Sequence, residues 1–363
     1  MDQSPGNLDG IGHDSAFVNV SIGSDEVLFV NTDRSGLNAA YKLGIAGAEC
    51  VGDFGVSHAV SDILVSGGEP FCLTIALLVP PETQIDFLEG VMIGANQAAK
   101  RYHAPIVAGD TKSNPSFAMV VTALGKGNVA ERITRTNAKP GDFLVVTGYL
   151  GSMFIGLCAM KQGLDLAASE RAIVHNAIIK QRPPERVGRI VAQSRIASAG
   201  TDISDGLPGA IFSICDASGY GAVLFEDLIP FDPRLKNTID ELGLLPLQMS
   251  AAGGDWEFLY AIPHEHMEEL QKLPSMNETL MTVVGVITAD PVSKIRTSDG
   301  NWRLLPRLIN DSFSDSASSK SHFSRLRTTF AYDEQTLDIR SHESSWAALR
   351  DQIRQLTNAG KGK

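Results

Sequence analysis

Residues 201–207 read Thr-Asp-Ile-Ser-Asp-Gly-Leu, and the apolar residues after them have helical spacing up to Ser218. Asp202 and Asp205 are three residues apart, so both carboxylates lie near one point if a helix starts here. Two like charges this close destabilise each other unless a cation neutralises them. Helix capping alone explains the stretch poorly, and we predict a cation site where the helix begins.

Four more aspartates share this setting, because each closes or follows an apolar run: Asp14, Asp33, Asp62 and Asp110. A single aspartate after a strand is usually a turn residue or a helix cap. Several carboxylates at strand ends, flanked by small residues, suit Mg²⁺, which takes oxygen ligands and shares its shell with water and substrate phosphates. The six together predict a magnesium-nucleotide site assembled from distant parts of one fold.

Two segments are candidates for phosphate binding. In Ala108-Gly-Asp-Thr111, Gly109 lets a backbone N–H approach a phosphate, and Asp110 can bind the metal that bridges its oxygens. Arg135 has the guanidinium geometry of a phosphate clamp, although it is equally explained as a charge at a domain junction. The chain has no GxxxxGK[ST] loop, which argues against a P-loop protein, and no GxSxG elbow, so Ser/His/Asp catalysis has no support in the sequence.

Two histidines lie near the predicted site. His13 precedes Asp14 and is either a ligand for water or phosphate or a polar loop residue. His58 lies one helical turn before Asp62, which would let it face the same site, although a core or surface histidine is the commoner case.

Bulk composition limits the class of protein. The chain has 363 residues, 43% of them hydrophobic, and a formal net charge of −11, which suits two globular domains and argues against a general nucleic-acid binder. The four cysteines are scattered in apolar surroundings, which is typical of buried thiols rather than of a zinc site. The first residues lack a signal-peptide pattern and the apolar runs are too short to span a bilayer, so we expect a cytoplasmic protein.

Strands and helices are expected to alternate, with long excursions, in an α+β fold of two domains. The expected strands are 27–31, 71–79, 106–108, 117–125, 143–147, 222–225, 259–262 and 281–287. The expected helices are 45–67, 84–102, 152–161, one that ends near Ser198, and 207–218. Pro140-Gly141 marks the boundary, which gives domains 1–137 and 138–300 followed by a polar linker and tail, 301–363. Residues 346–356 form an amphipathic helix, read either as a docked or frayed tail or as a partner-binding helix.

An ordered set of motifs resembles the superfamily of aminoimidazole ribonucleotide (AIR) synthetase, the PurM-like proteins, and within it thiamine-monophosphate kinase. The motifs are Gly12-His-Asp-Ser-Ala16, Thr32-Asp33, Ser61-Asp62 with Ser66-Gly-Gly-Glu-Pro70, Ala108-Gly-Asp-Thr111, Ala138-Lys-Pro-Gly-Asp142 with Val146-Thr-Gly-Tyr-Leu-Gly151, Arg182-Pro-Pro-Glu-Arg-Val187, Asp202-Ile-Ser-Asp-Gly-Leu207 and Gly253-Gly-Asp-Trp-Glu257. Each is weak alone, and their order and spacing make the resemblance specific.

The resemblance implies an N-terminal domain that contributes strands to a barrel across a homodimer, a C-terminal α/β domain, and ATP between the domains. It implies Mg²⁺ ligands at Asp14, Asp33, Asp62, Asp110, Asp202 and Asp205, and nucleotide contacts at Asn31, Thr32, Gly109, Asp110, Thr111, Arg135 and Ser204. Asp205, Asp110 and Arg135 become the candidate catalytic residues, and Asp255 and Trp256 the candidate acceptor-binding residues. The implied activity is Mg²⁺-dependent phosphoryl transfer from ATP.

Departures from the kinase pattern fall in its acceptor half. His13 replaces the first of two adjacent aspartates, residues 34–41 lack the kinase's histidine, and Gly254 takes the place of a glutamate. The kinase's aromatic C-terminal segment is replaced by an unrelated tail after about Asn310. Three functions therefore remain open: the kinase itself with the same or a different acceptor, a synthetase that activates an amide or carboxylate oxygen, and an ATP-binding regulatory protein.

Overall fold

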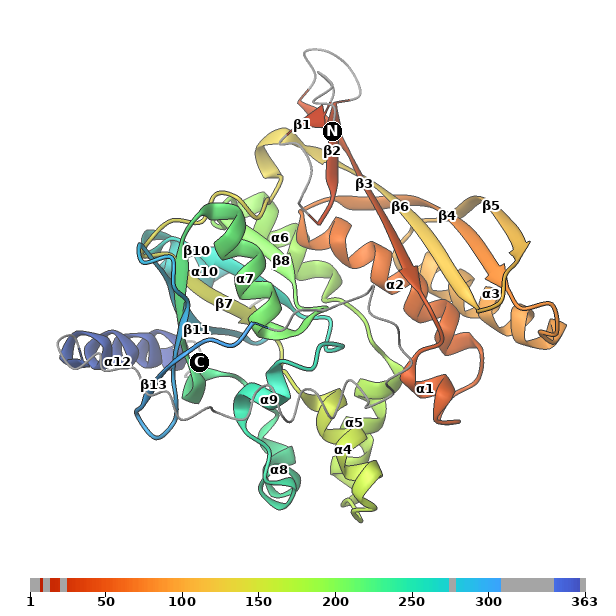
Figure 1. Cartoon of the computed structure of the whole chain (residues 1–363). Helices are drawn as coiled ribbons and strands as arrows, with labels where there is room; N and C mark the ends of the chain where they lie inside the picture. Colours follow the sequence, from red (N-terminus) through yellow and green to blue (C-terminus); the bar gives the residue numbers. More distant parts are fainter. Residues whose placement is uncertain (1–6, 9–13, 20–24, 274–278, 308–342, 360–363) are drawn as a thin grey trace. The chain divides into compact units, whose positions relative to one another are not determined.

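The computed structural model describes residues 7–8, 14–19, 25–273, 279–307 and 343–359 (Figure 1). Its contacts divide the chain into two compact units. The first consists of Met1–Thr134 and His175–Arg195, and the second of Arg135–Val174 and Ile196–Lys363. The boundary between the units therefore lies three residues before the domain boundary expected from the sequence. Residues 175–195, from the middle of the chain, pack with the first unit.

The first unit is built on one sheet. Among its described residues, six strands follow the order β1 (Asn7–Leu8), β2 (Ala16–Asn19), β3 (Glu26–Ser35), β6 (Ala118–Asn128), β4 (Glu69–Val79) and β5 (Ile106–Ser113). The pairs are antiparallel except β4 and β5, which are parallel and joined through helix α3 (Ile85–Arg101). A helical crossover is the usual connection between parallel neighbours.

Helices cover one face of this sheet. Helix α2 (Glu49–Val65) packs against β3 and β6, while α3 and α6 (Glu185–Ser194) pack against α2 (Figure 1). This central position explains why α2 has buried residues on nearly every side and no clear polar stripe. Short α1 (Ala39–Lys42) and the 3₁₀ turn η1 (Val129–Glu131) complete the unit.

A buried ion-pair network ties residues 175–195 to the first unit. Asp53 on α2 accepts hydrogen bonds from Arg101, at the end of α3, and from Arg182, whose Nη2 lies 2.9 Å from its Oδ2. Burial alone would raise the pKa of Asp53, but the hydrogen bonds and charges of the two guanidinium groups hold that pKa below its usual value. The carboxylate therefore stays charged, which the pairing requires.

The second unit also has a single large sheet. Its described strands follow the order β13 (Trp302–Leu304), β12 (Lys294–Arg296), β9 (Gly221–Phe225), β11 (Met281–Thr288), β7 (Phe143–Thr147), β10 (Phe258–Ile262) and β8 (Ala199–Asp202). All pairs are antiparallel except β9 with β12. Strands β7, β9 and β10 are buried at every residue, as continuous apolar strands covered on both faces should be.

Its helices are α4 (Ser152–Gln162), α5 (Ala168–Ile179), α7 (Gly206–Ser218), α8 (Lys236–Leu242), α9 (Pro246–Ser250), α10 (Met267–Lys272) and α12 (Glu343–Ala359), with 3₁₀ turns η2 (Glu226–Leu228), η3 (Pro233–Leu235) and η4 (His264–His266). Helix α5 crosses the division between the units. No helix in the described ranges is long and apolar enough to cross a membrane.

The expected elements are found, but several boundaries differ. Asp33 and Asp110 lie inside β3 and β5, so the prediction that these two follow strand ends was wrong, whereas Asp62 lies inside α2, within the helix expected over 45–67. The strands run on because neighbours pair with them: Asp33 lies opposite Val121. The prediction is confirmed for Asp202, the last residue of β8. The expected tail helix lies within α12, whereas most of the polar linker lies outside the described residues.

Candidate functional site

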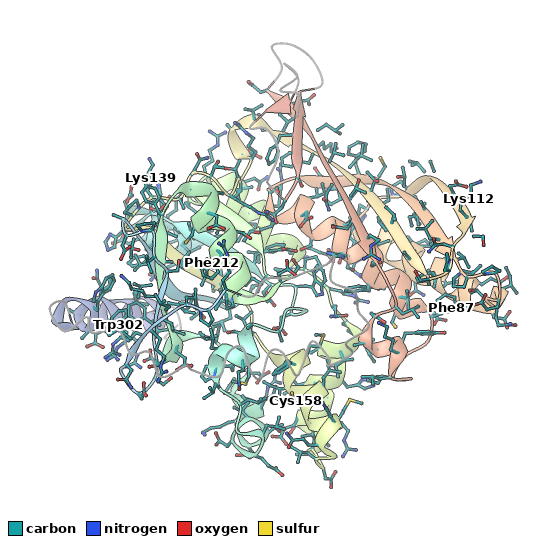
Figure 2. The ribbon with its side chains drawn as sticks, in the orientation of Figure 1. Phe87, Lys112, Lys139, Cys158, Phe212 and Trp302 are labelled. Atoms are coloured by element: carbon teal, nitrogen blue, oxygen red, sulfur yellow. The ribbon has the colours of Figure 1, made fainter. Side chains whose placement is uncertain are left out.

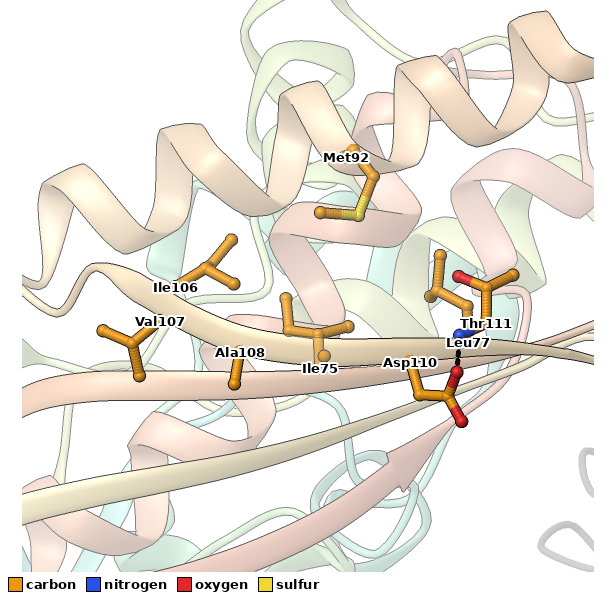
Figure 3. A pocket seen from close by; sticks show the side chains of 9 residues that line it. Ile75, Leu77, Met92, Ile106, Val107, Ala108, Asp110 and Thr111 are labelled. Carbon is orange, nitrogen blue, oxygen red and sulfur yellow. Dashed lines mark hydrogen bonds between the residues drawn. The ribbon is translucent and has the colours of Figure 1, made fainter.

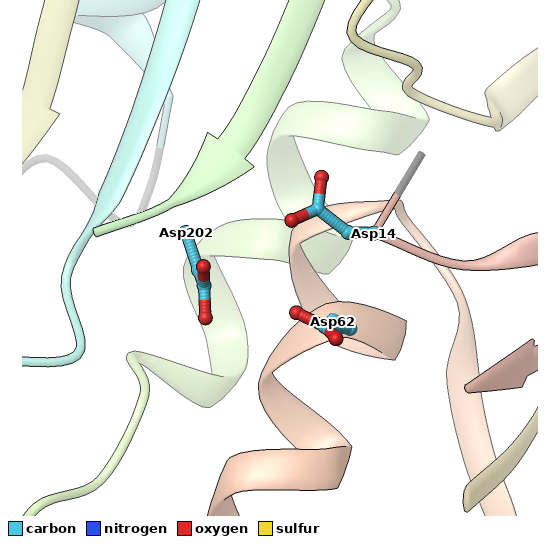
Figure 4. A group of neighbouring side chains, drawn as sticks. All are labelled: Asp14, Asp62 and Asp202. Carbon is cyan, nitrogen blue, oxygen red and sulfur yellow. The ribbon is translucent and has the colours of Figure 1, made fainter. Parts of the chain in front are cut away.

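Two of the predicted ligands meet in the first unit. Carboxylate oxygens of Asp14, just before β2, and of Asp62, on α2, lie within 4.8 Å of each other (Figure 4). The Ser15 hydroxyl donates to the backbone carbonyl of Asp62 at 3.0 Å, which fastens the start of β2 to the helix. Asp14 is buried, so water screens this pair of negative charges poorly. A divalent cation is the natural partner for such a pair.

Asp33 faces the same helix one turn away. The Asn31 side-chain amide donates to Asp33 Oδ2 at 2.6 Å and to the carbonyl of Ala59 at 3.3 Å. His58 Nε2 lies 4.0 Å from Asp33 Oδ1, and His58 and Asp62 are one turn apart on α2. The side chains of Asn31, Asp33 and His58 thus lie along the side of α2 that carries Asp62.

Thr32 and Asp110 lie on the opposite face of the sheet. The Thr32 hydroxyl is 2.9 Å from that of Thr122 on β6, and side chains alternate faces along a strand. Pairing aligns Asp33 with Val121, Ile75 and Gly109 in one row, so Asp110, the next residue, points the other way. Asp110 also lies three strand spacings, about 14 Å, from β3. Asp110 and Asp33 therefore cannot share one metal ion within this unit.

Strand β5 carries the predicted phosphate-binding segment Ala108–Thr111 along an open pocket. The pocket, of about 540 Å³, is lined by residues of β4, α3 and β5, including Gly109, Asp110 and Thr111 (Figure 3). Asp110 Oδ1 accepts from the Thr111 backbone N–H at 2.8 Å and lies 3.9 Å from the Lys112 ammonium group (Figure 2 labels Lys112). Both charged side chains are well exposed, so this pair contributes little to stability.

The stretch 201–207 forms the turn from β8 to α7 in the second unit. Asp202, labelled in Figure 4, is buried and accepts a hydrogen bond of 2.8 Å from the Ser204 hydroxyl. Asp205 begins α7, but its side chain does not cap the helix. Gly206 and Gly253 have φ of +79° and +70°, and a Cβ on either would lie 2.4 Å or less from a facing backbone carbonyl. Only glycine allows the two loops to pack this closely.

Residues 255–257 have their acidic side chains turned inward. Asp255 Oδ2 accepts from the Gly151 N–H at 2.6 Å, and the N–H groups of Ser152 and Met153 also donate to it, so it caps the start of α4. Burial raises the pKa of Asp255 to about 7, against the lowering effect of these three donors. Trp256, with φ of +57°, is 3% exposed. Neither side chain presents much surface to an acceptor in this unit, and their predicted role in acceptor binding stays a prediction.

Sequence reasoning missed the partner of this motif. The Thr147 hydroxyl donates to Glu257 Oε2 at 2.5 Å. Burial, with a smaller contribution from nearby Asp255, raises the pKa of Glu257 to about 7, against the lowering effect of the Thr147 hydrogen bond. The close contact between Gly148 and Glu257 shows that the Thr147-Gly148 turn is built around this carboxyl group. In the sequence, the signal for this contact was a Thr-Gly pair directly after one apolar run and an Asp-Trp-Glu triplet directly before another.

For two predicted residues, Arg135 and His13, the described contacts do not test the predicted role. The backbone carbonyl of Arg135 accepts from the Ser218 hydroxyl at 2.9 Å, which fixes the start of the second unit on the end of α7. Its role as a phosphate clamp stays a prediction. His13 lies outside the described residues.

Comparison with known proteins decides the family. Residues 12–127 match the N-terminal domain, and residues 139–298 the C-terminal domain, of AIR synthase related proteins. A thiamine-monophosphate kinase of Synechococcus elongatus is 31% identical over 246 residues, which cover 66% of this chain and 72% of that protein. This chain belongs to the AIR synthase-related family.

Other relatives agree with this assignment. A thiamine-monophosphate kinase of Pyrococcus abyssi is 33% identical over 216 residues, which cover 59% of this AIR synthase-related chain and 66%, just under two thirds, of that protein. The solved structure of AaThiL complexed with AMPPCP and TMP matches the fold with a TM-score of 0.67 at 23% identity, over 81% of this chain and 89% of that one. The predicted PurM-like α+β fold is thus confirmed. Helix α12 lies beyond the matched residues.

Proposed function

We propose that this AIR synthase-related chain is a Mg²⁺-dependent kinase that transfers the γ-phosphoryl group of ATP to thiamine monophosphate. The convergence of Asp14 and Asp62 within 4.8 Å carries the proposal. Both lie in the matched N-terminal domain, and relatives over 59% and 66% of this chain are named thiamine-monophosphate kinases. The solved structure with AMPPCP and TMP supports the same pair of ligands for this chain.

The residues of each unit have separable tasks in this proposal. Asp14 and Asp62 would hold Mg²⁺ in the first unit, and Asp202 and Asp205 are the candidate carboxylates of the β8–α7 turn in the second. A Mg²⁺ ion held by these residues would neutralise the negative charge that develops during phosphoryl transfer. The Ser204 hydroxyl orients Asp202, as the Asn31 amide orients Asp33. Positioning and electrostatics then provide most of the catalysis, without a covalent enzyme intermediate.

The direct test uses purified chain with Mg²⁺, ATP and thiamine monophosphate. We expect ADP and thiamine diphosphate to form in equal amounts, and neither to form in the presence of a chelator. ADP release without thiamine diphosphate would reject thiamine monophosphate as the acceptor and favour a different acceptor. Gly254 and segment 34–41, which has no histidine, would then explain the change of acceptor. Tight ATP binding without turnover on any acceptor would favour a regulatory protein.

We further propose that the chain works as a homodimer through the first sheet. The face opposite α2 and α3 carries half-buried apolar side chains, among them Leu28, Val30 and Val120, and no described helix of that unit covers it. An uncovered apolar sheet face of this kind marks an interface. Edge strand β5 is exposed along nearly its whole length, with Val107 61% exposed.

Val120→Arg places a charge on the uncovered face and is expected to convert dimer into monomer in sedimentation velocity experiments. Burying an unpaired guanidinium costs several kcal/mol, on the order of a whole small interface. Ile93→Arg is the matched control, because Ile93 is 51% exposed on α3, which covers the other face. A wild-type chain that sediments as a monomer at micromolar concentration would reject the dimer.

A further inference from the structure

The uncovered face of the first sheet carries opposite charges at the two ends of one row of side chains. Strand pairing aligns Arg34 on β3 with Val120 on β6, Val120 with Ala76 on β4, and Ala76 with Asp110 on β5 (strands labelled in Figure 1). Residues that lie directly opposite each other point to the same side of a sheet, so these four side chains form one row on this face. The row therefore begins with a guanidinium group and ends with a carboxylate.

These two charges are not neighbours within one chain. Arg34 and Asp110 are three strand spacings, about 14 Å, apart. Arg34 is exposed and takes part in no ion pair among the described residues. Asp110 lies 3.9 Å from the Lys112 ammonium group, but these side chains are 63% and 73% exposed, so water screens the pair. Both ends of the row are therefore available to a group outside the chain.

The middle of the face is uncharged and suits packing against a second sheet. The row next to Arg34 and Asp110 consists of small side chains, with Thr32, Thr122 and Thr74 aligned on β3, β6 and β4. The following row aligns Val30 with Leu124. Sheets that pack face to face lie about 10 Å apart with their strands nearly aligned. A second copy of this face can therefore approach closely, and its charges then have to find partners.

Two-fold symmetry limits how two copies of this face can meet, because each subunit contributes the same patch. With the axis parallel to the strands, each row lies over the same row of the other subunit with its ends exchanged. Arg34 then lies over Asp110 of the partner subunit. By the same operation Lys126, which pairs with Glu69 across β6 and β4, lies over the partner's Glu69. This arrangement brings opposite charges together at every one of these positions.

An axis that lies across the strands gives the opposite result. Each strand then lies over the same strand of the other subunit, so Arg34 meets either Arg34 of the partner subunit or an uncharged row. Burying a like-charged or unpaired guanidinium group in an interface is unfavourable. Charge complementarity therefore selects the axis parallel to the strands.

We propose that Arg34 of each subunit pairs with Asp110 of the partner subunit, in a dimer whose two-fold axis runs along the strands of the first sheet. The inference rests on the homodimer proposed above and adds a residue of one subunit to a site of the other. The partner's Arg34 comes to lie beside the predicted phosphate-binding segment Ala108–Thr111. A guanidinium group donates to carboxylate and phosphate oxygens alike, so this segment is completed only in the dimer.

Charge reversal at either end of the row tests the contact in sedimentation velocity experiments. Arg34→Glu places two carboxylates together across the interface, and Asp110→Arg places two guanidinium groups together. Each variant alone is expected to raise the dimer dissociation constant at least about a hundredfold, because like charges that face each other repel. Lys100→Glu is the matched control, since Lys100 is exposed in the last turn of α3, which covers the other face, and this variant should stay dimeric.

An equimolar mixture of the two variants gives the decisive result. In a mixed dimer the new glutamate faces the new arginine, and the native Asp110 of one chain faces the native Arg34 of the other. The mixture is therefore expected to dimerise within about tenfold of the wild-type affinity, although each variant alone does not. This rescue also shows that both variants are folded. A contact between Arg34 and Asp110 of the same chain could not be restored by mixing.

The other outcomes separate this arrangement from the homodimer and from the proposed reaction. Single variants that remain dimeric, or a mixture that remains monomeric, would overturn the pairing of Arg34 with Asp110. A wild-type chain that sediments as a monomer would overturn the pairing and the homodimer together. Sedimentation requires neither ATP nor an acceptor, so a chain that fails to phosphorylate thiamine monophosphate leaves this test unchanged.

Discussion

Asp62→Asn is expected to lower kcat/KM for ATP at least about a hundredfold, the scale seen when one preorganised electrostatic contact is removed. Asp62 and Asp14 place two carboxylates within 4.8 Å, and the neutral amide of asparagine leaves Asp14 as the only charge of this close pair. Steady-state kinetics at several Mg²⁺ concentrations measure the loss. Excess Mg²⁺ should restore part of the activity, since the remaining carboxylate still binds the ion weakly.

The same variant should behave differently in a stability measurement. The thermal midpoint in chelator should not fall, because the substitution removes one of two neighbouring like charges. The increase that Mg²⁺ and ATP give the wild type by mass action should be lost. Asp86→Asn is the matched control, an exposed aspartate on α3 of the same unit, which should retain both activity and the Mg²⁺ response. An unchanged Mg²⁺ response in Asp62→Asn would remove this carboxylate from the proposed metal site.

Asp53→Ala is expected to lower the free energy of unfolding by about 3–5 kcal/mol, the cost of breaking a buried ion pair from one side. It leaves two partly buried guanidinium groups, Arg101 and Arg182, without their shared carboxylate. It also removes the contact between Asp53 and Arg182, which holds the segment before α6 against α2. Urea unfolding of the first unit measures the change, and protection of residues 182–195 in hydrogen exchange should fall with it.

The exposed pair between Arg171 and Asp165 gives the control, since Asp165 is 96% exposed and Asp165→Ala should change stability by less than about 1 kcal/mol. Acid provides a second readout. The folded-state pKa of Asp53 is lowered. The contribution of Asp53 to the free energy of unfolding is therefore fully present above the ordinary aspartate pKa, and it is lost as the pH falls through the folded-state pKa. The difference between wild type and Asp53→Ala should therefore shrink in acid. A constant difference down to pH 2 would show that the charge of Asp53 is not what stabilises the unit.

Much of the fold was predictable because its signals are local. Helix α3 and strand β7 begin and end within one residue of their expected positions, since an amphipathic period and an apolar run bounded by Pro-Gly and Gly specify them directly. The position of segment 175–195 was not predictable in this way. Its place in the first unit depends on Arg182 reaching Asp53, a contact between residues 129 apart in sequence. Long-range pairing of this kind leaves no period or spacing in the chain.

In the candidate site too, sequence and tertiary structure determined different features. The sequence by itself selected the candidate aspartates, because carboxylate, glycine and hydroxyl residues close to apolar runs are a local pattern. Only the tertiary structure decided how they group: Asp14 meets Asp62, while Asp110 points away on the far face of the same sheet. Only the structure revealed that Asp255 caps α4 and that Arg34 and Asp110 end the same row of side chains. The reason is physical, since strand register and packing determine which side chains share a face, and both are set by contacts between distant segments.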